Sequence, residues 1–171
     1  KIIVMKFGGT SVADINHIKN VASIISNNFK KYKLVVILSA MAGVTNDLQK
    51  LIDEVNYPSS EENDLVITSG EQVSVGLLSM LLNKMGIKSI PLLGWQVPII
   101  TDSSHEKAKI LNINNENIQK YLQKNDVVVL AGFQGISEEG KITSLGRGGS
   151  DTTAVAIASS LGAERCDIYT D

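Results

Sequence analysis

Short apolar runs rich in Val and Ile alternate along this chain with segments of helical periodicity. Runs of strand length occupy residues 1–7 (KIIVMKF), 34–40 (LVVILSA), 88–93 (KSIPLL), 97–101 (VPIIT), 127–133 (VVVLAGF) and 166–170 (CDIYT). Runs that are apolar throughout are typical of strands buried on both faces. The alternation therefore predicts an α/β protein with a mostly parallel sheet sandwiched between helices.

The segments between these runs predict the helices and turns. Helices are expected over residues 15–25, 48–55, 65–86, 116–124 and 151–162, where apolar residues recur three and four positions apart. The 65–86 helix is expected to be strained or broken near Ser69 and Gly70 and to end at Gly86. Residues 8–11 predict a tight loop, residues 57–64 a polar turn, and residues 137–142 a hairpin turn.

Composition excludes several classes of protein. A length of 171 residues with 43% hydrophobic and 20% charged residues fits one globular domain or a piece of one. The net charge of -2 gives no electrostatic reason for a nucleic-acid partner or an anionic membrane. Cys166, the single cysteine, is expected to be a buried strand thiol in a reducing compartment. We therefore expect a soluble, cytoplasmic protein.

Ligands of parallel α/β sheets bind at the carboxyl ends of the strands, so the loops after the strands are the candidate sites. In KFGGTS, Lys6 ends the first strand, and Gly8 and Gly9 follow at once. Glycines let backbone N–H groups approach an anion, and a lysine adds positive charge. The chain has no GxxxxGK[ST] and no GxGxxG motif, which argues against a P-loop or a Rossmann dinucleotide site. On spacing alone, a tight turn with an edge lysine remains an alternative.

Two further loops carry polar groups beside the predicted strand ends. SAMAGVTN offers Ser39 and Thr45, although Thr45 or Asn46 could simply cap the following helix. TSGEQVS places Glu71 directly after the expected helix break. Glu71 is either an acid favoured by the helix dipole or the partner of a substrate ammonium group.

The stretch LGRGGSDTTA holds Arg147 among three glycines, ahead of Ser150 and Asp151. The chain has only two arginines against fourteen lysines. Arginine offers a planar fork that pairs with a carboxylate or a phosphate through two hydrogen bonds, which lysine cannot copy. Ser150 or Asp151 is expected to cap the next helix, but capping does not explain the arginine. We therefore interpret this loop as functional.

The sequence does not support a metal site or catalysis by a histidine. His17 and His105 are far apart and lack the spacing of a Ser–His–Asp triad or a metal site, so surface or local structural roles are expected. One cysteine and two histidines are too few ligands for a structural zinc site.

Seven segments together resemble the aspartate kinases of the amino-acid kinase superfamily. They are residues 4–12, 35–46, 69–74, 101–110, 128–135, 144–158 and 167–171. They follow the family order across nearly the whole chain, and the first and sixth are individually specific. The resemblance implies an amino-acid kinase (carbamate kinase-like) fold. It makes residues 1–171 the N-terminal, substrate-side portion of the kinase domain, truncated at its C-terminal side and without the regulatory domains.

The resemblance also implies roles for particular residues. The catalytic residues would be Lys6 and Asp151. The substrate-binding residues would be Ser39, Thr45, Glu71, Arg147 and Ser150. The nucleotide- and phosphate-binding residues would be Lys6, Gly8, Gly9, Thr170 and Asp171. No protein metal ligand is implied, because Mg²⁺ would be held mainly by ATP.

The implied reaction moves the γ-phosphoryl group of ATP to the side-chain carboxylate of L-aspartate. The product, 4-phospho-L-aspartate, would lead to lysine, threonine, methionine and isoleucine. Phosphoryl transfer depends on positioning and charge neutralisation, and an acceptor carboxylate is already ionised at neutral pH. The absence of an activated histidine is therefore consistent with the implied chemistry.

Two alternative functions remain open. The chain could be a sibling kinase with another acceptor, such as glutamate, acetylglutamate or UMP. It could instead be a ligand-binding remnant without turnover. A homodimer is one assembly open to it. Because the family domain continues past YTD, we expect the 171-residue chain alone to keep the substrate cleft and to show little kinase activity.

Overall fold

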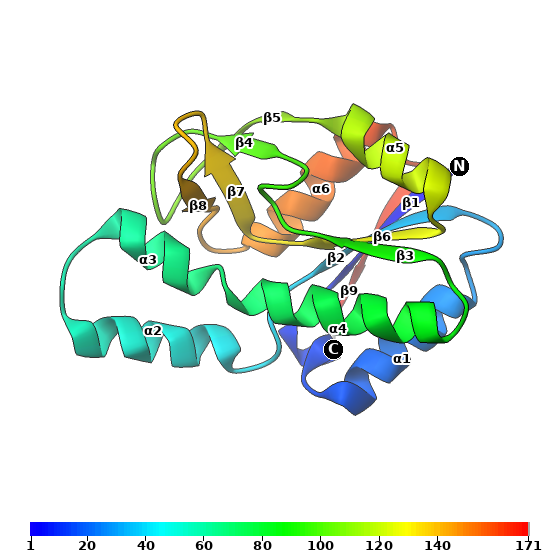
Figure 1. Ribbon diagram of the computed structural model, residues 1–171, viewed down its shortest axis with the longest axis horizontal. Coiled ribbons are helices and arrows are strands. Elements are labelled where there is room, and N and C mark those ends of the chain that lie inside the picture. The colour runs from blue at the N-terminus through cyan, green and yellow to red at the C-terminus, as the bar shows by residue number, and fades with distance from the viewer. Residues whose placement is uncertain (171) are drawn as a thin grey trace.

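The centre of the protein is a five-stranded parallel sheet. The structure is a computed structural model and describes residues 1–170. The sheet order is β3-β6-β2-β1-β9, and every pairing in it is parallel (Figure 1). Its strands are β1 (Ile2–Phe7), β2 (Lys33–Leu38), β3 (Ser89–Leu92), β6 (Val127–Ala131) and β9 (Arg165–Tyr169). All five lie within the predicted runs or within one residue of them, so the predicted fold class is confirmed.

Helices cover both faces of this sheet, as Figure 1 shows. On one face lie α1 (Ile15–Ser26) and α4 (Gly70–Lys84), and on the other lie α5 (Asn115–Lys124) and α6 (Gly149–Leu161). Successive strand residues point to opposite faces. Ile3 and Met5 therefore join the core on the α1 and α4 side, whereas Val4 joins the core on the α5 and α6 side.

A smaller mixed sheet extends the domain beside the carboxyl ends of the main strands. It contains β4 (Ile99–Thr101), β5 (Ile110–Ile113), β7 (Gln134–Ser137) and β8 (Ile142–Ser144), in the order β5-β4-β7-β8. Strand β4 and the turn between β7 and β8 confirm the predictions for residues 97–101 and 137–142. The other three strands were not predicted. They are three or four residues long, and β5 is at most half-buried, so no apolar run marks them.

The prediction of a polar turn over residues 57–64 is wrong, because helix α3 (Ser60–Ile67) begins within it. The side chain of Ser59 caps this helix by accepting the N–H of Glu62, at 3.4 Å. Glu61 and Glu62 occupy the first turn, where carboxylates are favourable. The expected break near Ser69 is confirmed, since α3 ends at Ile67 and α4 starts at Gly70.

Two shorter helical segments complete the chain. Helix α2 (Val44–Val55) confirms the prediction for residues 48–55 and begins four residues earlier. The tight loop after β1 contains the 3₁₀ helix η1 (Gly9–Val12). Gly86, with φ of 83°, follows the end of α4 and fits the expected stop.

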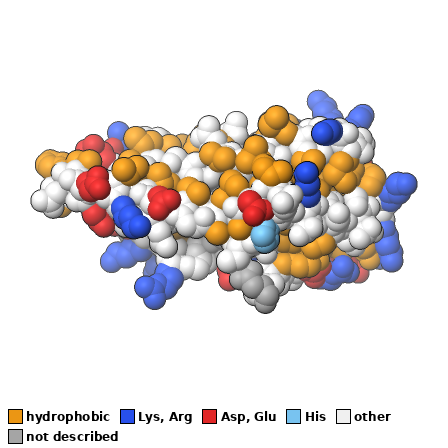
Figure 2. Space-filling model, turned by 90° about the horizontal axis from the view of Figure 1, so that it is seen from below, with side chains coloured by type: hydrophobic (Ala, Val, Ile, Leu, Met, Phe, Trp, Pro, Cys, Tyr) orange, Lys and Arg blue, Asp and Glu red, His pale blue; other side chains and the backbone are white. Residues whose placement is uncertain are grey.

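Residues 60–84, which span α3 and α4, are long and apolar enough to cross a membrane. Half of the apolar window is nevertheless buried inside the protein, and Val75, Leu78 and Leu82 of α4 belong to the core. The segment is therefore accounted for as a core helix with a preceding short helix. On the face seen in Figure 2, hydrophobic side chains are interspersed with charged ones of both signs.

Cys166 lies on β9, as predicted, but it is only half-buried. Burial and the nearby carboxylates raise the pKa of its thiol above the ordinary value, so the thiol form is favoured. The strand assignment is confirmed, whereas the expected full burial is wrong, because β9 stands at the end of the strand order among the described residues.

Candidate active site

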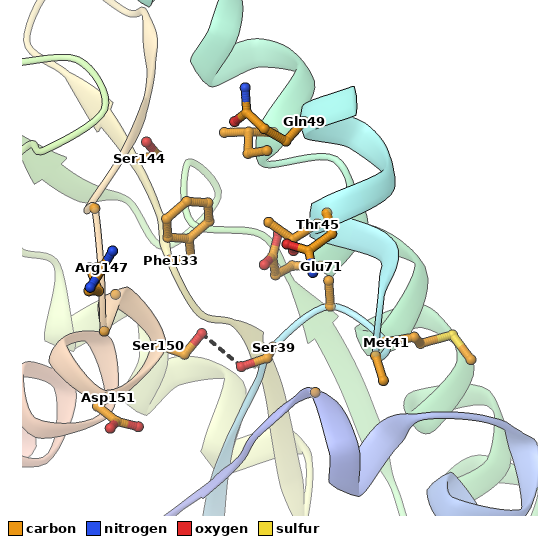
Figure 3. Close-up of a pocket in the computed structure, with 18 of the residues that line it drawn as sticks. Ser39, Met41, Thr45, Gln49, Glu71, Phe133, Ser144, Arg147, Ser150 and Asp151 are labelled. Carbon is orange, nitrogen blue, oxygen red and sulfur yellow. Dashed lines mark hydrogen bonds between the residues drawn. The ribbon is translucent and has the colours of Figure 1, made fainter. Parts of the chain in front are cut away.

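A cleft of about 730 Å³ opens at the carboxyl ends of β1, β2 and β6 (Figure 3). Parts of the chain that are distant in sequence meet there: the loops after β1 and β2, the first turns of α2 and α4, and the loop before α6. It is lined by eight predicted site residues, Lys6, Gly9, Ser39, Thr45, Glu71, Arg147, Ser150 and Asp151. Residues from four separate sequence motifs thus lie together at the carboxyl ends of the strands, where ligands of parallel sheets bind.

Lys6 and Asp151 form an ion pair at the cleft. Lys6 Nζ lies 2.8 Å from Asp151 Oδ1, and the lysine side chain is only 13% exposed while that of Asp151 is 52% exposed. Asp151 is in the first turn of α6, so this helix delivers a carboxylate to the end of β1. A Cβ at Gly8 would lie 3.4 Å from Lys6 Nζ, so the small residue leaves room around the ammonium group. The pair fixes a cation beside the glycine loop.

A hydrogen bond joins the loop after β2 to the first turn of α6. Ser39 Oγ donates to Ser150 Oγ at 3.0 Å, drawn as a dashed line in Figure 3, and Ser74 Oγ donates to the Ser39 carbonyl at 2.7 Å. A Cβ at Gly132 would lie 2.7 Å from Ser150 Oγ, so glycine is needed for α6 to approach β6 this closely. Ser39 and Ser150 are therefore held next to each other by packing as well as by their own contact.

The predicted side-chain caps of α2 and α6 are wrong. Glycines occupy the N-cap positions, Gly43 with φ of 83° and Gly148 with φ of 72°, and neither helix has a side-chain cap hydrogen bond. A positive φ costs glycine little, so the sharp entry to each helix does not require a capping side chain. Thr45, Ser150 and Asp151 are consequently left free of capping and lie along the cleft.

Glu71 is a buried carboxyl group with an unused oxygen. It is 3% exposed, and its Oε1 has no hydrogen-bond partner among the described residues. Burial raises the pKa of Glu71 to about 7, partly offset by backbone hydrogen bonds at Glu71 itself and Ala40. A buried, unsatisfied acceptor is costly, so its presence at a cleft wall indicates a ligand donor.

Arg147 faces this acidic wall from the opposite side of the cleft. Figure 3 shows Arg147 on the loop before α6, with Glu71 and Thr45 across from it. Arg147 is exposed and has no ion-pair or hydrogen-bond partner among residues 1–170. A free guanidinium and a buried carboxyl group therefore flank one space, which suits a ligand carrying both a carboxylate and an ammonium group.

The remaining predicted site residues lie at the edge of this arrangement. Gly8 adjoins Lys6, and Thr170 follows the residue that pairs with Phe7, so the two strand ends are neighbours. Tyr169 stacks on Phe7, with ring centroids 4.5 Å apart. Asp171 lies outside the described residues.

The cleft also contains residues that the sequence did not suggest. Phe133, Gln49, Asn63 and Glu106 line it. Phe133 has φ of 73°, an uncommon backbone conformation for a bulky residue, and such outliers concentrate at functional sites. The two glycines of the motif AGFQG could have indicated that Phe133 belongs to the site. Gln49, Asn63 and Glu106 occupy ordinary polar segments that gave no such indication.

Neither histidine forms a metal site with its neighbours. Across residues 1–170 no group of three or more His, Cys, Asp or Glu side chains is placed to hold a metal ion. His17 has the expected local role, because its ring contacts Asp14 at 2.7 Å at the start of α1. His105 contacts the buried Asp64.

The parallel sheet and the cleft at its strand ends define an α/β protein with a charged cleft that opens beside a glycine loop and a lysine. The amino acid kinase family matches residues 1–171, and the chain belongs to this family.

The chain is 49% identical over 172 residues to an aspartokinase of Geobacillus stearothermophilus. This match covers 99% of the chain and 42% of that relative. Among solved structures, it resembles aspartokinase III of E. coli in complex with aspartate and ADP, with TM-score 0.89 and 25% identity. That match covers the whole chain and 49% of the E. coli chain. An aspartate kinase from Synechocystis has TM-score 0.84 and 41% identity and is covered to 28%. The chain thus spans less than half the length of these relatives.

Proposed function

We propose that the protein acts as an aspartate kinase and that its cleft binds L-aspartate. One observation carries the proposal: Arg147 and the unsatisfied, buried Glu71 flank the same space, next to the Lys6–Asp151 ion pair. The names of the relatives and the aspartate in the E. coli complex support the same ligand.

The cleft offers a partner for each group of the amino acid. The Arg147 fork pairs with a carboxylate through two hydrogen bonds, and Glu71 accepts from the α-ammonium group. The hydroxyl groups of Thr45 and Ser150 supply further donors along the cleft. Because the two charged partners lie on opposite walls, they favour a zwitterionic ligand over a simple dicarboxylate.

The phosphate side of the site fits ATP with Mg²⁺. A Cβ at Gly9 would lie 3.0 Å from the Ala40 carbonyl oxygen, so this loop is packed too closely for a side chain. Gly8, Gly9 and Lys6 would hold phosphate oxygens, and Thr170 lies at the neighbouring strand end. Mg²⁺ would be held mainly by the nucleotide phosphates.

The residues then account for the chemistry. A carboxylate oxygen of aspartate attacks the γ-phosphorus, the bond from that phosphorus to the bridging oxygen breaks, and ADP leaves with the electron pair. Lys6, oriented by Asp151, neutralises charge on the transferring group. No proton has to be removed from the acceptor, since its carboxylate is ionised at neutral pH.

Calorimetry with a ligand panel tests this proposal. L-aspartate should bind, succinate should bind more weakly because it lacks the ammonium group, and L-asparagine more weakly because it lacks the second carboxylate. Equal affinity for L-glutamate would instead favour a sibling kinase. Aspartate binding without ATP binding would identify a ligand-binding remnant, and ATP-dependent formation of an acyl phosphate would establish turnover.

We further propose that the protein is cytoplasmic, as expected of a metabolic kinase, and that it forms a homodimer. Sedimentation equilibrium measures the second point directly, and a monomer at all concentrations would contradict it.

A further inference from the structure

Asp64 is a fully buried carboxylate outside the cleft. It belongs to α3 and has 0% exposure. Ser144 Oγ donates to Asp64 Oδ1 at 2.6 Å, and the Ser144 N–H donates to Oδ2 at 3.1 Å. His105 Nδ1 contacts Oδ2 at 2.7 Å, and the Glu106 N–H lies 3.1 Å from both oxygens. Two separate segments therefore converge on a carboxylate that belongs to a third.

A buried charge of this kind is retained only when its hydrogen bonds are complete. Here the backbone N–H groups of Ser144 and Glu106 are two of the donors, so the carboxylate fixes main-chain positions as well as side chains. Removing a partner from such a network leaves an unsatisfied charged acceptor. The network thus specifies one arrangement of the three segments.

That arrangement includes the loop that carries Arg147. The Ser144 carbonyl accepts the Ala108 N–H at 2.9 Å, and the next residue, Leu145, donates its N–H to the Phe133 carbonyl at 3.0 Å. A Cβ at Gly146 would lie 3.0 Å from the Glu106 carbonyl oxygen. The start of the Arg147 loop is therefore packed on the same turn that Asp64 holds.

The other end of the network leads to Glu71. The Asp64 carbonyl accepts the Thr68 hydroxyl at 2.7 Å, and the Thr68 carbonyl accepts Gln134 Nε2 at 2.6 Å. Thr68 lies three residues before Glu71, at the junction of α3 and α4. Asp64 consequently links the element before Glu71 to the strand before Arg147, and these are the two opposite walls of the cleft.

We propose that Asp64, Ser144 and His105 are positioning residues that set the separation between Arg147 and Glu71 and thereby the affinity for the amino acid. The inference rests on the proposed function for the identity of the ligand. Asp64 itself does not line the cleft. Its effect on the ligand passes through the Arg147 loop.

Ser144→Ala is the most direct test, because it removes the hydroxyl donor and keeps the backbone N–H. Ser144 also lines the cleft, so hydrogen exchange of the ligand-free chain is needed to separate its effect on the Arg147 loop from a contact with the ligand. Ser144→Thr retains a hydroxyl group and serves as the conservative rescue. Ser137→Ala is the matched control: Ser137 is also buried, lies in the same hairpin, and accepts the Lys141 N–H at 3.1 Å outside the network. Asp64→Asn is a stronger variant, but it could fail to fold.

Two measurements on the 171-residue chain decide the matter. In calorimetry, Ser144→Ala should weaken L-aspartate binding about tenfold, the effect of losing roughly one charged hydrogen bond, and Ser144→Thr should restore it. Ser137→Ala should lower the melting temperature without changing aspartate affinity. In hydrogen exchange of the ligand-free chain, Ser144→Ala should speed exchange over residues 144–149 and leave β1 and β2 unchanged.

Unchanged aspartate affinity in Ser144→Ala, together with a lower melting temperature, would reduce the network to a structural support and overturn the inference. If the unmodified chain binds no L-aspartate, the proposed function fails. The exchange experiment then still judges the network, because unchanged exchange over residues 144–149 would show that it does not hold the Arg147 loop.

Discussion

Arg147 carries the only guanidinium in the cleft, and its role depends on shape as well as charge. Arg147→Lys keeps the positive charge but replaces the planar guanidinium group, which can pair with a carboxylate through two hydrogen bonds, by a compact ammonium group. We expect aspartate binding to weaken by about 1–3 kcal/mol, the range for a lost charge-assisted hydrogen bond. Calorimetry or the KM for aspartate measures the effect. An unaltered constant would remove Arg147 from the carboxylate site.

Lys6 is expected to act on the transferring group instead of the amino acid. Lys6→Ala removes the cation that Asp151 orients at 2.8 Å. In a full-length enzyme, turnover should fall by at least about a hundredfold, the loss typical of one electrostatic stabiliser, while aspartate affinity stays within about threefold. The comparison is kcat against the aspartate dissociation constant. Lys120→Ala, exposed on α5, is the control for loss of a surface charge. If only aspartate binding changed, Lys6 would be a substrate-positioning residue.

The contact between β6 and α6 depends on the absence of a side chain at Gly132. Gly132→Ala places a Cβ 2.7 Å from Ser150 Oγ and 3.0 Å from Ser150 Cα, so α6 has to move. We expect about 1–3 kcal/mol of lost stability, as for overpacking, and weaker aspartate binding because Ser150 and Arg147 move with the helix. Thermal unfolding and calorimetry measure these two effects. Gly76→Ala in α4, where a Cβ meets nothing within 4 Å, should be neutral or stabilising. Equal stability of the two variants would contradict the packing argument.

The strands and most helices could be predicted because buried parallel strands are apolar at every position. VVVLA of β6 is an example, since all five of its residues are buried. The three short strands of the second sheet could not, because they are only three or four residues long and no apolar run marks them. Helix α3 was missed although Ser59 and Glu62 carried a capping signal, since Pro58 and the neighbouring serines and acids favoured a turn.

Part of the site followed from the sequence for a physical reason. Parallel topology brings strand-end loops together, so Lys6 and Ser39 could be assigned to one region. Arg147 was interpreted as functional for another reason, because arginine is rare in this chain and stands here among glycines. The predicted side-chain caps of α2 and α6 were wrong, and they show what local sequence cannot predict. A polar residue near a helix start does not reveal whether a glycine in the left-handed region already makes the turn. The burial of Asp64 was also hidden, because its partners lie 41 to 80 residues away.

At the scale of the whole molecule, Glu71 couples folding stability to pH. Its pKa in the folded state is about 7, whereas the ordinary value is 4.5. Between these values the folded protein holds a proton that the unfolded chain has released. The free energy of unfolding should therefore decrease as pH rises from about 4.5 to 7, by about 3 kcal/mol in total. Glu71→Gln, which stays neutral, should lack this contribution and exceed the unmodified protein in stability above pH 7. Denaturant unfolding of both proteins from pH 5 to 8.5 measures the difference, and parallel curves would refute it.

The same proton links stability to ligand binding. A substrate ammonium group beside Glu71 favours the ionised carboxylate, so aspartate must lower the pKa that burial raises. Aspartate affinity should therefore increase as pH rises from 6 to about 7.5 and level off above the free-state pKa of about 7. Binding at pH 6.5 should release a proton, which calorimetry in two buffers of different ionisation enthalpy detects. Glu71→Gln should bind more weakly, with no such pH dependence. Proton release that persists in this variant would assign the linkage to another group. The burial of Glu71 lowers the free energy of unfolding while the cleft is empty, and ligand binding restores that contribution.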